Sequence, residues 1–145
     1  MNDKYDWMAA TAASLVLWHA VALAADPKAS PPDAVVKQLF DKDQVGIAGK
    51  ELMMLTVEYL PGGASLPHRH DAQVFVYVLE GAVIMQVAGS PAVTLRPGET
   101  FYENPADVHM VSANASKTVP AKILVFIVKD KNAPVTRGVP AKSGS

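Results

Sequence analysis

Residues Pro61–Gly81 read PGGASLPHRHDAQVFVYVLEG, and this stretch combines a strong strand signal with a pair of closely spaced histidines. One residue separates His68 from His70, and alternate residues of an extended strand project from the same face. Two imidazoles can therefore be directed at one point. The following segment Val74–Leu79 (VFVYVL) is apolar on both faces and too short for a typical helix. It predicts a central strand in a two-layer β-structure.

Further short apolar segments recur on both sides of this stretch. Glu51–Leu60 alternates between apolar and polar residues, as a half-buried strand does. The other candidate strands are Val83–Val87, Ala92–Leu95, Val108–Val111 and Ile123–Val128. Turn-forming residues separate them, and no helical periodicity of three turns interrupts the series. The pattern predicts an all-β sandwich or closed barrel over residues 51–129.

The segments that flank this barrel are predicted to be less regular. Residues 25–50 form a proline-containing linker and an N-terminal segment, in which Asp33–Phe40 holds one turn or a short strand. Residues 130–145 have little to bury and are expected to form a flexible tail.

An apolar leader precedes the linker. Met8–Ala25 reads MAATAASLVLWHAVALAA, and the small residues Ala22 and Ala24 have the form of a secretory cleavage site. We therefore expect a signal peptide over residues 1–24, cleavage after Ala24, and a periplasmic or secreted domain without stable membrane insertion. An uncleaved membrane anchor is the alternative, because Asp3 and Asp6 reduce the positive charge that a signal peptide usually carries.

Composition narrows the chemistry that the chain can perform. Its 145 residues carry 13 basic and 14 acidic side chains, so there is no basic excess for nucleic acid. The absence of cysteine excludes thiolate metal sites, disulfides and cysteine nucleophiles, and leaves histidine, carboxylate and amide groups as metal ligands. Because His19 lies in the leader, the mature chain keeps three histidines: His68, His70 and His109.

At these residues the sequence resembles the cupin superfamily, in particular its small, single-domain, type-2 microbial members. The first cupin motif, G-x5-H-x-H-x3,4-E-x6-G, is met by Gly62, His68, His70 and Gly81. The second, G-x5-P-x-G-x2-H-x3-N, is met in part, by Pro97, Gly98 and His109, and its final Asn stands one residue late at Asn114. The resemblance implies a jelly-roll barrel, or double-stranded β-helix, with a metal ion inside its mouth.

The sequence departs from the first motif at one metal ligand. The position of the usual glutamate is occupied by Val74, which cannot bind a metal. Gln73 has a ligating oxygen, but strand alternation directs it away from the face of Val74 unless a bulge intervenes. We therefore expect His68, His70 and His109 to hold one divalent ion, with Gln73 as a less favoured ligand.

Three neutral imidazoles would leave such an ion its full +2 charge, which favours an anionic or enolate-like ligand. The site type is similar to that of the diketone-cleaving and thiol dioxygenases among the cupins, and this similarity implies Fe(II). Zinc, manganese, nickel and copper remain open, because three histidines also serve those ions.

Two side chains on the N-terminal side of His109 are candidate catalytic groups. Tyr102 and Glu103 precede the turn that leads to His109, where they would orient a substrate or carry a proton. The alternative is that Tyr102 packs at the rim and Glu103 is a solvated turn residue.

The sequence therefore favours a mononuclear metal-dependent, dioxygenase-like enzyme acting on a small chelating substrate. A lyase or isomerase of the same fold, and a non-enzymatic module that binds a metal or small ligand, are the alternatives. An enzyme should present at least one of Tyr102, Glu103 and Gln86 to the metal. We also expect a homodimer in which Asp33–Phe40 pairs across a two-fold axis.

Overall fold

A computed structural model describes residues 34–43 and 46–139, so the predicted signal peptide lies outside the described residues. All regular structure in this part of the chain is β-strand. No helix in these ranges is long and apolar enough to cross a membrane.

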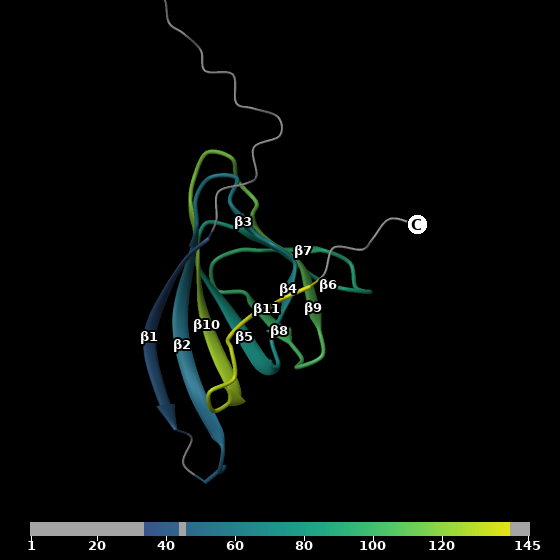
Figure 1. The fold of residues 1–145 in the computed structure, drawn as a ribbon. Helices are drawn as coiled ribbons and strands as arrows, with labels where there is room; N and C mark the ends of the chain where they lie inside the picture. Colours follow the sequence, from purple (N-terminus) through teal and green to yellow (C-terminus); the bar gives the residue numbers. More distant parts are fainter. Residues whose placement is uncertain (1–33, 44–45, 140–145) are drawn as a thin grey trace, which may run out of the picture.

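The strands form two antiparallel sheets that face each other (Figure 1). A five-stranded sheet has the order β1-β2-β10-β5-β8, and a six-stranded sheet contains the path β11-β4-β9-β6-β7 with β3 paired to β9. The strands are β1 (Val35–Asp43), β2 (Lys50–Tyr59), β3 (Ala64–Ser65), β4 (His68–Arg69), β5 (Ala72–Glu80), β6 (Val83–Val87), β7 (Val93–Leu95), β8 (Thr100–Glu103), β9 (Val108–Asn114), β10 (Ala121–Asp130) and β11 (Arg137–Gly138). This is the jelly-roll arrangement that the sequence predicts.

The core forms between the sheets from alternate residues of the long strands. In β5, the even-numbered residues from Ala72 to Val78 are buried and the residues between them are exposed. β2 and β10 contribute in the same way, so most of the buried apolar cluster comes from three neighbouring strands. Burial of this apolar area is the main force that holds the sheets together.

β5 is a central strand, as predicted, because it pairs with β10 on one side and β8 on the other. Its outer face, however, is open. Phe75 lies 5.0 Å from Tyr102 and 6.5 Å from Phe126, measured between ring centroids, and all three side chains are exposed. The apolar residues on both faces of this strand therefore reflect one face in the core and an aromatic cluster on the outside.

Gly81 and Asn114, which belong to the two motifs, stabilise the end of the barrel where the amide of Ala115 donates to the carbonyl oxygen of Ala82. Gly81 has a positive φ of 70°, and a Cβ atom there would lie 2.5 Å from the carbonyl oxygen of Pro120, so another residue would not fit. Asn114 donates from its side chain to the carbonyl oxygens of Tyr59, Leu60 and Val119. This Asn ties β2, β9 and the loop before β10 together, which is a structural role.

The segment 33–40 was expected to hold one turn or a short strand, and its residues 35–40 lie in the nine-residue strand β1. β1 pairs with β2 of the same chain along almost its whole length, while every residue of β1 is exposed. Its other edge pairs with no strand among the described residues.

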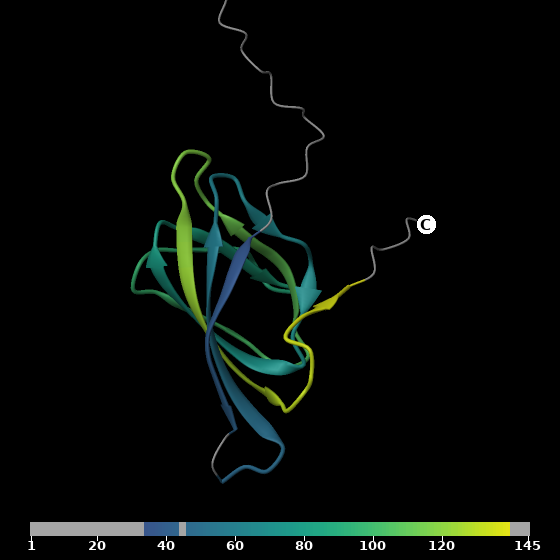
Figure 2. The ribbon, with the colours of Figure 1, turned by 60° about the vertical axis from the view of Figure 1, so that its left-hand side comes forward.

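The tail after Asp130, predicted to be flexible, returns to the barrel in its described part, where β11 pairs with β4, as the yellow segment in Figure 2 shows. Lys129 is buried and binds Glu51 and the carbonyl oxygen of Ala133, which fixes the turn that starts this return. The pairing with β4 and the contact with Glu51 join residues far apart in the sequence, so the local composition does not reveal them.

Candidate metal centre

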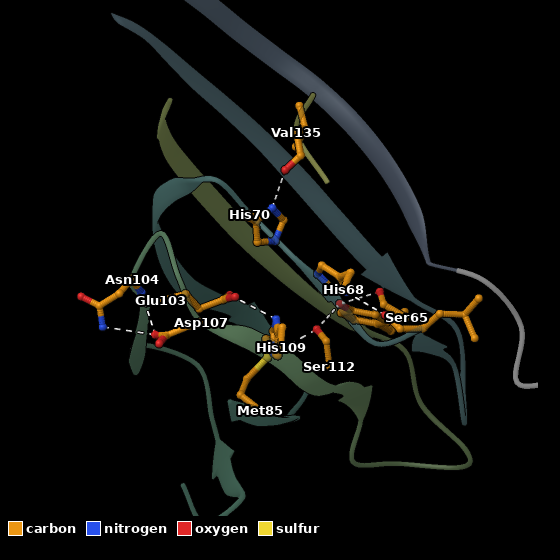
Figure 3. Close-up of polar contacts among 12 residues, drawn as sticks. Ser65, His68, His70, Met85, Glu103, Asn104, Asp107, His109, Ser112 and Val135 are labelled. Atoms are coloured by element: carbon orange, nitrogen blue, oxygen red, sulfur yellow. Dashed lines mark hydrogen bonds and ion pairs between the residues drawn. The ribbon is translucent and has the colours of Figure 1, made fainter. Parts of the chain in front are cut away.

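The three histidines predicted as ligands meet at one end of the barrel. His68 lies on β4 and His109 on β9, and these two residues are direct partners in the pairing of the strands. His70 follows β4, so that the rings of His68 and His70 have centroids 4.9 Å apart. One ring nitrogen of each histidine lies within 4.8 Å of the corresponding atoms of the other two. Figure 3 shows the three side chains converging from two segments of the chain.

Each of the three imidazoles has an acceptor at its Nδ1 atom. Nδ1 of His68 lies 2.7 Å from the carbonyl oxygen of Leu66, and Nδ1 of His70 lies 2.5 Å from that of Val135. Nδ1 of His109 lies 3.2 Å from Oε1 of Glu103. A carbonyl or carboxylate oxygen only accepts, so a neutral ring bound in this way carries its proton on Nδ1 and keeps the Nε2 lone pair free.

The unused Nε2 atoms fit a metal ion. Nε2 of His109 is buried and has no hydrogen-bond partner among the described residues. A buried nitrogen without a partner is costly unless something else binds it. Burial lowers the pKa of His68, which favours the neutral form that a metal requires. The donor set therefore fits one divalent ion held by His68, His70 and His109.

Glu103 supports this site from the adjacent sheet. It lies on β8 opposite Val74 in the pairing with β5, and its side chain is only 2% exposed. It is therefore not the solvated turn residue that was the alternative. Its contact with Nδ1 of His109 orients that ring, whereas Oε2 has no partner among the described residues. Carboxylates commonly hold metal-binding histidines in this way.

The structure does not bring the other three polar residues considered from the sequence to the site. Tyr102 is 42% exposed and lies on the outer face, because it is the neighbour of inward-facing Glu103 on β8. Gln73 is also exposed on the outer face, since no bulge disturbs the alternation between Gln73 and Val74. Gln86 donates to the carbonyl oxygen of Ser90. None of the three lines the cavity beside the histidines.

Val135 is a member of the site that the sequence analysis missed. Its carbonyl oxygen binds a histidine 65 residues earlier in the chain, and Val135, Thr136 and Gly138 line the cavity. Arg137 holds the segment in place through Oδ2 of Asp71 at 2.5 Å. A main-chain oxygen can come from any residue type, so no sequence signal identifies this contact.

A cavity of about 380 Å³ opens from the histidines into the barrel. Its wall is mainly apolar, and Val74 forms part of it beside the histidines. Three hydroxyl groups add a polar patch: Tyr59 Oη lies 2.5 Å from Ser112 Oγ and 3.3 Å from Ser65 Oγ. Burial raises the pKa of Tyr59, so its hydroxyl remains a neutral donor at ordinary pH.

Comparisons with known proteins agree with this architecture. A family model described as "Cupin domain" matches residues 55–127. Among solved structures, an oxalate oxidase in complex with a substrate analogue, glycolate, matches with a TM-score of 0.59 and 23% identity, covering 85% of this chain and 63% of its own. A cupin domain from Bordetella pertussis matches with a TM-score of 0.56 and 18% identity, covering 70% of this chain and 98% of its own.

A DMSP lyase from Ruegeria pomeroyi matches with a TM-score of 0.51 and 22% identity, over 57% of this chain. The match spans only 41% of the lyase, so this chain corresponds to part of that longer protein. No curated protein matches the chain. At these identities the structural neighbours establish the fold, and the family model establishes the family.

Proposed function

Because the chain belongs to the cupin family, we propose that it is a mononuclear metal-dependent enzyme of the oxygenase type, acting on a small chelating substrate. The observation that carries this proposal is the geometry of the three imidazoles. One ring nitrogen of each histidine lies within 4.8 Å of those of the other two, and each Nδ1 atom has an oxygen atom beside it, at the end of a cavity large enough for a small molecule.

A divalent ion held by His68, His70 and His109 would supply a Lewis acid with open positions for a chelating, anionic or enolate-like substrate. Fe(II) is the proposed ion, and zinc, manganese, nickel and copper are the alternatives. The barrel residues orient the ligands and exclude water, since Val74 and the other wall residues surround the site with apolar groups. Glu103 keeps the ring of His109 in the orientation and tautomer that ligation needs.

Glu103 also favours an enzyme over a passive binding module. Its Oε2 atom is buried without a partner in the described chain, and the residue lines the same cavity as the histidines. A carboxylate in that position is able to accept a proton from a bound substrate. The same observation supports the second candidate, a lyase or isomerase that moves a proton without consuming oxygen.

Metal analysis followed by oxygen uptake distinguishes these proposals. We expect one ion per chain, and oxygen uptake with a member of a panel of diketones, flavonols, catechols and thiols. His109→Ala should abolish both, whereas Gln86→Ala, outside the cavity, should change neither. Uptake that survives His109→Ala would reject the oxygenase. Conversion of a panel compound without oxygen would favour the lyase or isomerase.

Location and assembly belong to the same proposal. We expect the mature protein to begin at Ala25 in the periplasm or medium, which N-terminal sequencing of the exported protein tests. A homodimer joined through the open edge of β1 is supported by the exposed apolar side chains of Val35, Val36, Leu39 and Phe40. The mass of the protein in solution, with and without β1, tests this assembly.

A further inference from the structure

The cavity beside the histidines has two groups of polar side chains in an otherwise apolar lining. One group consists of the three histidines and Glu103. The other consists of the hydroxyl groups of Tyr59, Ser65 and Ser112, which form a single hydrogen-bonded cluster. The rest of the lining includes Leu55, Val57, Val76, Val125 and Ile127. A ligand that fills this space must therefore be mainly apolar outside the atoms that meet these two groups.

The strand pairing gives the separation of the two groups. His68 pairs with His109, and Ser65 pairs with Ser112, on the same strand β9. Ser112 follows His109 by three residues on β9, and Ser65 of β3 precedes His68 of β4 by three residues. At the usual rise of a β-strand, three residues correspond to at most about 10 Å of backbone, because the pairing of β9 is irregular between Val111 and His109. A compound the size of a substituted benzene ring can span this distance, with one end at the histidines and the other at the hydroxyl groups.

The hydroxyl cluster has unused capacity to bind such a ligand. Three hydroxyl oxygens offer three donors and six lone pairs. The contacts within the cluster are Tyr59 to Ser112, Tyr59 to Ser65, and Ser112 to the sulfur of Met85. Because Ser112 donates to Met85, these three contacts use the three donors and leave lone pairs free; Figure 3 shows Ser65, Ser112 and Met85 with these contacts as dashed lines. A ligand hydroxyl group would therefore find a hydrogen-bond acceptor there.

The charges around the cavity exclude a second anionic group on the ligand. Among the described residues, no lysine or arginine lines the cavity. The lining contains one carboxylate side chain, that of Glu103, and a second anionic group would not pair with it. A carboxylate or phosphate far from the metal would be removed from water without a cation to pair with, which is strongly unfavourable.

We infer that the substrate is a compact, mainly apolar compound whose only negative charge is carried by its chelating atoms, with a hydroxyl group at its far end. This inference rests on the proposed function, because it places the chelating atoms at a metal held by the histidines. It excludes dicarboxylates, sugar phosphates and other compounds with a remote anionic group.

Three hydroxamates with the same chelating group test this inference without catalytic turnover. Benzohydroxamate, 4-hydroxybenzohydroxamate and 4-carboxybenzohydroxamate differ only at the end remote from the metal. Their binding to the full-length protein, loaded with redox-inert Zn(II), is measured by calorimetry. We expect the 4-hydroxy compound to bind at least as tightly as the parent, and the 4-carboxy compound to bind about tenfold more weakly or worse.

Substitutions in the hydroxyl cluster locate the far end of the ligand. Tyr59→Phe should weaken the 4-hydroxy compound by about threefold to tenfold and leave the parent unchanged. Ser112→Ala provides a second variant should Tyr59→Phe fail to fold. Tyr77→Phe, on the exposed outer face, is the matched control and should alter neither ligand.

The outcomes separate this inference from the proposed function. If zinc binds but the 4-carboxy compound binds as tightly as the parent, or no hydroxamate binds, the substrate class is wrong and the metal site stands. If the cluster variants affect all three hydroxamates equally, the placement of the far end is wrong. If zinc does not bind to the histidines, the proposed function fails and this inference fails with it.

Discussion

The two ends of the described chain add to the barrel in opposite ways. β1, near the N-terminus, pairs with β2 along almost its whole length and lines the cavity through Val36, yet no described residue of β1 is hydrogen-bonded to a histidine of the site. The C-terminal segment pairs with β4 through only Arg137 and Gly138, but its Val135 carbonyl oxygen binds His70. The C-terminal segment is therefore linked to the histidines by one carbonyl oxygen, whereas β1, a full strand, has no such hydrogen bond. Extensive backbone pairing and involvement in the site are separate properties.

Removal of the C-terminal segment and removal of β1 should differ most strongly in their effect on Zn(II) affinity. A chain that ends at Lys131 loses the partner of His70, so its dissociation constant for Zn(II) should rise by about tenfold to a hundredfold. A chain that lacks residues 1–43 should melt at a lower temperature but bind Zn(II) like the wild type. Competition with a chromophoric chelator measures the affinity, and thermal unfolding measures the stability. Equal loss of Zn(II) affinity in both truncated chains would contradict the comparison.

Two lysines at the start of the C-terminal segment, Lys129 and Lys131, should differ in their effect on stability. Lys129→Met removes a buried donor from Glu51 and Ala133, which should lower the free energy of unfolding by about 2 kcal/mol and also weaken Zn(II) binding. Lys131→Met removes an exposed ion pair with Asp43 of β1 and should have no measurable effect on the melting temperature. Denaturant unfolding of both variants tests this difference. Similar losses in the two would show that the buried anchor has no special role.

Glu103 lies on a strand of the barrel, β8, and is the partner of His109. Glu103→Gln keeps an acceptor for His109 but removes the negative charge, so we expect Zn(II) affinity to fall by up to about tenfold. Tyr102→Phe, the adjacent residue on the outer face, is the control and should bind Zn(II) normally. The measurement is the same chelator competition. Unchanged affinity in Glu103→Gln would mean that charge at this position does not contribute.

The smallest expected effect is the pH dependence of the metal-free protein. Because burial lowers the pKa of His68 below 6.5, the unfolded chain takes up a proton at a higher pH than the folded chain does. Stability is therefore fully present above pH 6.5 and is lost as the pH falls through the lowered value. Melting temperatures from pH 8 to 5 should fall less in His68→Gln than in the wild type. The chain without β1 should keep the wild-type dependence, and a dependence equal in all three would contradict the assignment to His68.

Most of the barrel could be predicted from the sequence because alternation of apolar residues is a local property. The six candidate strands between 51 and 128 overlap β2, β5, β6, β7, β9 and β10, whereas the short strands β3, β4 and β8 were not among them. The spacing of His68 and His70, the count of three histidines in the predicted mature chain and the resemblance to the cupins together placed His109 in the same candidate site. The same alternation predicted that Gln73 faces away from the cavity.

The rest depended on contacts between distant residues. Tyr102 and Glu103 are adjacent, and only the pairing of β8 with β5 decides which of them faces the histidines. The tail was predicted to be loose because its own composition is polar, while the lysine that anchors it lies at the end of β10. The hydroxyl cluster joins Tyr59 to Ser112, 53 residues apart, and no local pattern connects them.

The contact between Val135 and His70 also sets the order in which the protein is completed. Val135 follows all the strands from β1 to β10, so these strands are synthesised before His70 can gain this acceptor. Among the strands from β3 to β10, β4 alone pairs with a strand beyond that point, β11, so the barrel is able to assemble first. Metal loading with full affinity would then be a late event in biogenesis.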